Sequence, residues 1–230
     1  ITSFTVSSSD ASSSANPIAA GAFHNCAILD NASVKCWGRS NLGNLGIGTT
    51  DDRGNEPGEM AALSSINLGT GRTATSISGG NVHTCALLDN ASVKCWGHGG
   101  NGRLGQGNTN DLGDGANEMG DNLPSIDLGT GRTATAIASM RNHTCAILDN
   151  ASVKCWGENG QGQLGIGNTE LMGNTSNEMG DNLPSIDLGT GRTATAIATG
   201  YFHSCAALDN GAVKCWGDNF HGQLGIGTTD

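Results

Sequence analysis

The sequence predicts an all-β protein in which one module of about 60 residues is used four times. Near-copies of the segment HTCAILDNASVKCWG at 143–157 recur at 24–38, 83–97 and 203–217, so successive copies start 59, 60 and 60 residues apart. All eight cysteines, all four tryptophans and all four lysines lie inside these copies. The chain also contains 37 glycines among its 230 residues, a composition that favours turns over helices.

Each copy is predicted to form a β-hairpin. In the third copy, apolar residues alternate on both sides of the polar segment 149–151, which is typical of two short strands. In the fourth copy the tip ends in Gly211, and a glycine there suits a three-residue loop closed by a left-handed residue. This loop length sets Cys145 directly opposite Cys155 on one face of the hairpin.

The two cysteines of each copy are therefore predicted to form a disulfide, because opposed positions on one sheet face are close enough to bridge. The even number of cysteines favours the same interpretation. A bridge that closes so short a loop contributes about 3 kcal/mol if its effect is treated as chain entropy. The predicted bridges are Cys26–Cys36, Cys85–Cys95, Cys145–Cys155 and Cys205–Cys215.

Metal binding is the alternative use of these cysteines, because a histidine precedes the first cysteine of each copy by two residues. These histidines are His24, His83, His143 and His203. Zinc sites usually combine four ligands and include a closely spaced pair, whereas each hairpin supplies three widely spaced ones. We therefore expect no metal and no cofactor, and we expect the histidines to pack or to form hydrogen bonds.

Two more strands are predicted in each full repeat. Residues 120–138 and 180–198 have the same sequence, GDNLPSIDLGTGRTATAIA. Within it, β-prone segments at 125–128 and 133–138 flank the glycine-rich turn 129–131. Together with the hairpin, these segments predict four strands per unit.

Residues 1–16 (ITSFTVSSSDASSSAN) differ from the repeats, which occupy 17–230. A β-prone stretch at 1–6 precedes a serine-rich connector that we expect to be flexible. The chain starts at Ile1 instead of methionine, and bridged cysteines are typical of exported proteins. We therefore predict a secreted, extracellular protein.

Charge, hydropathy and motifs exclude several classes of function. The formal net charge is −10 and no run of basic residues exists, so nucleic acid is not an expected partner. No window is apolar enough to predict a membrane span. No nucleophile elbow, zinc-protease motif or Ser-His-Asp order is present, so we predict no catalytic residue and no enzymatic activity. The densest acidic loop lacks the spacing of an EF-hand and is predicted to be a solvated turn; it contains Asp111, Asp114, Glu118 and Asp121.

The pattern H-[ST]-C-A-x-L-D-N-G-x-V-x-C-W-G, followed by N-x-x-G-Q-L-G-x-G, resembles the regulator of chromosome condensation repeat family. The resemblance covers residues 17–230 and is clearest at 203–217 and 222–225. It implies a β-propeller in which each unit forms one four-stranded blade. The paired cysteines are similar to those of secreted members of that family.

The number of repeats departs from the family pattern, which usually closes a ring with seven blades, whereas this chain carries four hairpins. Three arrangements remain open. The stretch at 1–6 could complete the last blade of a small ring, or it could pair with a neighbouring subunit. The third possibility is that the chain is a piece of a longer array.

Two further sets of residues are candidates for sites. Sequons predict possible N-glycosylation at Asn31, Asn90, Asn142, Asn150 and Asn174, although the asparagines at the hairpin tips are also what the turn requires. The tryptophans are predicted to pack between adjacent blades instead of stacking on carbohydrate; they are Trp37, Trp96, Trp156 and Trp216.

The favoured hypothesis is a non-enzymatic extracellular structural or adhesive element that associates with itself, as a homo-oligomer or a fibre, through its N-terminal strand. The alternative is a secreted module that binds or inhibits another protein. Its specificity would lie in the variable position after each C-W-G, which holds Arg39, His98, Glu158 and Asp218. A guanine-nucleotide exchange factor is the third possibility, and the bridged cysteines disfavour it.

Overall fold

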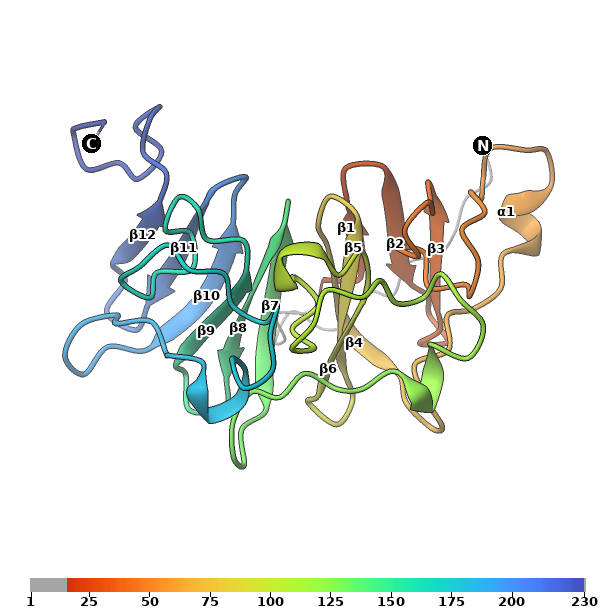
Figure 1. Cartoon of the computed structure of the whole chain (residues 1–230), viewed down its shortest axis with the longest axis horizontal. Coiled ribbons are helices and arrows are strands. Elements are labelled where there is room, and N and C mark those ends of the chain that lie inside the picture. The colour runs from red at the N-terminus through yellow and green to blue at the C-terminus, as the bar shows by residue number, and fades with distance from the viewer. Residues whose placement is uncertain (1–15, 230) are drawn as a thin grey trace.

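The computed structural model describes residues 16–229, and the predicted strand at 1–6 lies outside them. Four antiparallel sheets stand side by side in one row, in chain order (Figure 1). We call these sheets blades 1 to 4. Their strands are β1 (Ile18–Ala20), β2 (His24–Ile28), β3 (Val34–Gly38); β4 (Ala74–Gly79), β5 (His83–Leu88), β6 (Val93–Gly97); β7 (Ala134–Met140), β8 (His143–Leu148), β9 (Val153–Gly157); β10 (Ala194–Thr199), β11 (His203–Leu208) and β12 (Val213–Gly217).

Helical structure among the described residues is confined to short turns in the connections between blades. These are α1 (Glu59–Ala62), η1 (Gly100–Gly102), η2 (Gly120–Asn122) and η3 (Gly180–Asn182). None of the helices in the described part of the chain has both the length and the apolar character needed to cross a lipid bilayer. The prediction of an all-β protein with four repeats is therefore confirmed.

The second and third strands of each blade form the predicted hairpin. In blade 3, Cys145 pairs with Cys155 across β8 and β9. The third tip residue is left-handed, with φ of 60° at Ala151 and 81° at Gly211, as the loop length requires. The opposed cysteines are bonded in all four hairpins, with 4.0 to 4.1 Å between their Cα atoms.

The predicted fourth strand at 125–128 is wrong, because each blade contains three strands. The segment donates one backbone hydrogen bond to the edge of blade 2, from Ile126 N to the Val93 carbonyl oxygen, at 2.8 Å. Its own carbonyl groups bond elsewhere: that of Asp127 accepts from Gly180 N, and that of Leu128 accepts from the Lys154 ammonium. A regular ladder therefore cannot form along this edge.

Alternation along the hairpins gives every blade two different faces. The disulfide face carries the cysteines and faces the next blade, whereas the indole face carries the tryptophan and faces the preceding blade. Between blades 3 and 4, the disulfide face contributes Cys145, Ile147, Val153 and Cys155, and the indole face contributes Ala194, Ile197, Ala206, Leu208 and Trp216. The same pairing of faces recurs between blades 1 and 2 and between blades 2 and 3.

These contacts between blades make up the hydrophobic core. Trp96 and Trp156, whose indoles lie between blades, are fully buried, which agrees with the predicted packing role. Truncating such a side chain to alanine typically costs about 3–5 kcal/mol. The core is therefore a series of apolar layers, and each layer is formed by the facing sides of two successive blades.

Candidate functional site

The turn between the first two strands and the end of the third strand lie at the same end of each blade. We call the surface that these ends of the four blades form the turn face. The residue after each C-W-G is fixed there by a backbone hydrogen bond of 2.9 to 3.0 Å to the turn of its own blade. The donor and acceptor pairs are Arg39 and Phe23, His98 and Val82, Glu158 and Asn142, and Asp218 and Phe202. The four predicted partner-binding residues thus occupy equivalent places on one face.

Exposed aromatic side chains lie in the turns of blades 1 and 4 and in the loop that follows blade 4. Phe23, Tyr201 and Phe220 are 59%, 52% and 74% exposed, although large aromatic groups usually bury most of their surface. With Phe202 they are all the phenylalanine and tyrosine residues of the part of the chain that the structure describes. In blade 4, Tyr201 and Phe202 lie together with 4.9 Å between their ring centres, and aromatic groups are enriched in surfaces that contact other proteins.

Arg141 organises the aromatic groups of blade 4 from the turn of blade 3. Its guanidinium carbon lies 3.7 Å from the ring centre of Phe202 and 4.5 Å from that of Tyr201. The guanidinium also pairs with Glu158 at 3.1 Å, and Glu158 accepts a hydrogen bond from the Asn142 amide at 2.9 Å. Arg141 itself adopts a left-handed φ of 48°, a conformation that a residue in a tight turn can hold at some strain.

A second arginine lies beneath this surface. Arg103 is 4% exposed, and its guanidinium donates to the carbonyl oxygen of Gly100 and to the side-chain oxygen of Asn142. Burial lowers its pKa to about 10, against the opposing effect of the Glu158 and Asp111 carboxylates. Arg103 therefore remains protonated at neutral pH and links the loop that follows blade 2 to the turn of blade 3.

The sequons divide into two groups by position. Asn31, Asn90 and Asn150 are exposed at the hairpin tips, which lie at the opposite end of each blade from the turn face. Each side-chain oxygen accepts hydrogen bonds from the serine two residues later, so each asparagine also supports its turn. Asn142 and Asn174 are half-buried, and the Asn142 amide is bonded to Glu158.

The acidic loop residues bind backbone groups of the protein itself. Asp111 accepts from Gly99 N, Glu118 accepts from Gly113 N and Gly115 N, and Asp121 accepts from Thr70 N and its hydroxyl. Within residues 16–229, no group of three or more histidine, cysteine or carboxylate side chains is arranged to hold a metal ion. These carboxylates stabilise the loops that join the blades.

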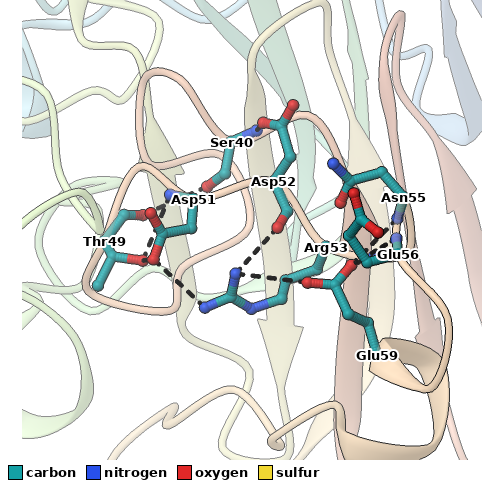
Figure 2. A network of polar contacts seen from close by, with 9 residues as sticks. Ser40, Thr49, Asp51, Asp52, Arg53, Asn55, Glu56 and Glu59 are labelled. Atoms are coloured by element: carbon teal, nitrogen blue, oxygen red, sulfur yellow. Dashed lines mark hydrogen bonds and ion pairs between the residues drawn. The ribbon is translucent and has the colours of Figure 1, made fainter.

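Figure 2 shows the corresponding loop of the first repeat, where Arg53 points between two carboxylates. Its guanidinium lies 3.4 Å from Asp51 and 3.8 Å from Glu59. The second oxygen of Glu59 accepts three backbone N–H groups, from residues 54–56, and the bond from Glu56 is the main cause that lowers the Glu59 pKa. The charges of this loop are therefore engaged in holding its shape.

Sequence reasoning did not identify the partners of the histidines. Each of the first three histidines contacts a hydroxyl group of the next blade at 2.8 to 3.0 Å: His24 with Thr84, His83 with Thr144, and His143 with Ser204. The signal was present, because a serine or threonine follows the histidine directly in the last three copies. Alternation places that hydroxyl on the indole face and the histidine on the disulfide face.

Comparisons with known proteins agree with this architecture. A family model described as regulator of chromosome condensation (RCC1) repeat matches residues 18–44, 74–103, 135–163 and 194–223, and a second model of that description matches 33–87 and 152–207. The ultraviolet-B receptor UVR8 of Arabidopsis thaliana is 34% identical over 213 residues, which make up 91% of this chain and 43% of the receptor.

Solved structures support the fold. Human WBSCR16 superposes with a TM-score of 0.70 at 18% identity, covering 95% of this chain and 52% of the compared one. A structure of Kap60 bound to yeast RCC1 (Prp20) gives a TM-score of 0.69 at 20% identity, covering 91% and 44%. The chain thus spans about half the length of these relatives.

Proposed function

This chain belongs to the RCC1 repeat family, and we propose that it is a secreted, non-enzymatic β-propeller module that binds another protein through its turn face. The observation that carries the proposal is the cluster of Tyr201 and Phe202 around the Arg141 guanidinium on that face. Kap60 bound to yeast RCC1 is an example of a protein complex formed by a structural relative. The partner of this chain would meet an aromatic surface beside the ion pair of Arg141 and Glu158.

The chemistry of the turn face suits a protein partner. Aromatic and arginine side chains are enriched in protein interfaces: aromatic groups bury large areas with few rotatable bonds, and arginine offers several hydrogen-bond donors and stacks on aromatic rings. Tyr201 and Phe202 are held by the Arg141 guanidinium before any partner arrives, which lowers the cost of ordering them. The residues at the variable positions differ in charge from blade to blade, and this provides a basis for selectivity.

A pull-down from the extracellular fraction of the native source tests this function. The unmodified chain should retain one stoichiometric protein, and the double variant Tyr201→Ala, Phe220→Ala should lose it. Arg192→Ala is the matched control, because Arg192 is also exposed but lies near the hairpin tips. The proposal would be overturned if the double variant retained the same protein, or if the unmodified chain retained no protein.

The extracellular location is part of the proposal. Four disulfides agree with folding in an oxidising compartment, since cytosolic thiols are kept reduced. In a source that glycosylates proteins, we expect glycans at Asn31, Asn90 and Asn150, because these tips are exposed and distant from the turn face. Peptide mass spectrometry of native material would show them, and bare tip peptides would remove this expectation.

A second candidate function is a structural or adhesive element that associates with itself. One observation favours it: the repeats have diverged little, since residues 120–138 and 180–198 are identical. The role proposed for the stretch at 1–6 in such an assembly stays a prediction.

A further inference from the structure

An asparagine followed directly by a glycine occurs three times in the chain, at 101–102, 159–160 and 210–211. Asparagine is a chemically labile residue, because the next backbone nitrogen can attack its side-chain amide carbon. Glycine favours the attack, since it has no Cβ to crowd the nitrogen and adopts many backbone conformations. The structure places the three dipeptides in different surroundings, which decide whether the attack can take place.

The dipeptide at 159–160 is protected by hydrogen bonds. Asn159 is 0% exposed. Its amide nitrogen donates to the carbonyl oxygens of Asn168 and Glu170, both at 2.9 Å, and its amide oxygen accepts from Leu164 N at 3.0 Å. The side chain therefore cannot turn toward the nitrogen of Gly160 without breaking these bonds in the interior of the protein.

The dipeptide at 101–102 is protected by close packing. Gly102 is buried, and a methyl group placed on its Cα atom would collide with the backbone of Gly173 and Asn174, in the connection between blades 3 and 4. The attack closes a ring that includes the backbone of both residues of the dipeptide, so Asn101 and Gly102 must rotate together. The neighbouring backbone leaves little room for this rotation.

The dipeptide at 210–211 lies at the tip of the fourth hairpin, and the Asn210 side chain is exposed. The equivalent asparagines of the other three tips are exposed as well, so this exposure belongs to the hairpin and does not depend on which blade follows it. Gly211 N donates to the carbonyl oxygen of Leu208 at 3.0 Å. Brief opening of this exposed turn is enough to free the nitrogen.

The fourth tip also differs from the others in sequence. Its third residue is Gly211, whereas the other tips have an alanine there, whose Cβ hinders attack by the nitrogen of that residue. The residue after it is Ala212, where the other tips have the serine that completes a sequon. Neither a Cβ atom nor a glycan therefore shields Asn210.

We propose that Asn210 is a site of spontaneous modification, at which the folded protein converts the side-chain amide to aspartate or isoaspartate. The backbone nitrogen of Gly211 forms a bond to the side-chain carbonyl carbon of Asn210, and the bond from this carbon to the amide nitrogen breaks. The proton of the Gly211 N–H group leaves with the amide group as ammonia. Water then opens the cyclic imide at one of its two carbonyl carbons, and this hydrolysis gives aspartate or isoaspartate.

The product changes the tip and leaves the rest of the blade intact. Either product adds a negative charge, and isoaspartate also lengthens the backbone of the loop by one methylene group. The disulfide between Cys205 and Cys215 keeps the two strands paired beyond the tip. The turn face lies at the opposite end of the blade, so the modification is independent of the partner binding proposed above.

Peptide mapping of the folded protein over time tests the proposal. After incubation at neutral pH, the chain is unfolded, reduced and digested with trypsin. Asn210 is the only side-chain amide of the peptide 193–214, and Asn101 is the only one of the peptide 95–103. In the folded protein, conversion of the amide to the acid should be at least about tenfold faster in 193–214, a ratio that corresponds to about 1.4 kcal/mol between the two activation barriers.

The unfolded, reduced chain is the first control. Both peptides should convert at similar rates in it, because the same dipeptide is then free in both. Equal rates of conversion in the folded protein would overturn the proposal, since the surroundings of the two sites would then make no difference. Persistence of the Asn210 amide in the folded protein, after the unfolded chain has lost it, would also overturn the proposal.

The second control is the variant Gly211→Ala, which gives the fourth tip the third residue of the other tips. Ala151 adopts the same left-handed conformation at the equivalent place, so the variant should keep its fold, and thermal unfolding checks this. Conversion of Asn210 in the folded variant should fall at least about tenfold. An unchanged rate would show that attack by the nitrogen of residue 211 is not the reaction that removes the amide.

Discussion

The Nε2 atom of His143 lies 3.0 Å from the Oγ atom of Ser204, and that hydroxyl donates to the carbonyl oxygen of Gln163 at 2.9 Å. A hydroxyl group has one proton to donate, so Nε2 of His143 must carry the proton that the hydroxyl accepts. The contact therefore fixes the tautomer of the imidazole as well as the distance between blades 3 and 4. The Trp216 indole donates to the same carbonyl oxygen at 2.9 Å.

Replacing Ser204 with alanine should destabilise the contact between blades 3 and 4. The substitution leaves the buried Nε2 donor of His143 without an acceptor, and an unsatisfied buried group costs about 1–3 kcal/mol. Ser185→Ala, at an exposed position, should change stability by less than about 0.5 kcal/mol. Urea unfolding of the two variants measures the difference, and equal stabilities would contradict the hydrogen-bonded role of Ser204.

Acidification should destabilise the protein through its buried histidines. Desolvation by burial lowers the pKa of His24 and of His143 to about 4, below the ordinary value of 6.5, and also lowers the pKa of His83. The unfolded chain therefore binds more protons between about pH 6.5 and pH 4. The contribution of the neutral histidines to the free energy of unfolding is fully present above this window and is lost as the pH falls through it.

The expected loss between pH 7 and pH 5 is about 2 kcal/mol for each of His24 and His143. Urea unfolding at several pH values measures it. His143→Asn should remove the contribution of one histidine and flatten the profile, even if it lowers stability at pH 7. A variant with an unchanged pH profile would show that His143 is not the group that titrates.

The four disulfides should differ in their resistance to reduction. Cys205–Cys215 is half-buried, whereas the equivalent Cys145–Cys155 lies fully buried beneath blade 4. Because exchange requires access to a sulfur atom, limited reduction of the native monomer should open the fourth bridge first. Alkylation followed by peptide mapping identifies the order. Simultaneous opening of all four would indicate global unfolding instead.

The hairpins could be predicted from the sequence because their determinants are local. The turn residues fix a three-residue loop, and this loop sets Cys145 opposite Cys155, as the structure has them. The positive φ at Ala151 follows from the same loop, even though alanine lacks the conformational freedom of glycine. Interactions within about ten residues were sufficient to define this part of the fold.

The partners in neighbouring repeats could not be predicted in the same way. The carbonyl oxygen of Asp127 accepts from Gly180, which is 53 residues away (180 − 127), and so it does not extend a ladder with blade 2. Because the repeats are nearly identical, equivalent backbone N–H groups recur in several of them, and the sequence alone does not tell which repeat donates to Asp127. The turn face depends likewise on Arg141 meeting Phe202 from another blade. Such contacts arise from packing between blades.

The equivalent lysines of blades 3 and 4 provide a matched pair for the last prediction. Lys154 is 7% exposed, and its ammonium donates to the carbonyl oxygens of Leu128 and Gly180 at 3.0 and 2.8 Å. Lys214 has the same neighbours in sequence but is exposed.

Lys154→Met should lower the free energy of unfolding by about 3 kcal/mol, because two hydrogen bonds from a charged donor contribute at least roughly 1.5 kcal/mol each. Lys214→Met should cost less than about 0.5 kcal/mol in urea unfolding of the monomer. Equal losses in the two variants would show that the ammonium contacts of Lys154 do not stabilise the segments that join blade 3 to blades 2 and 4.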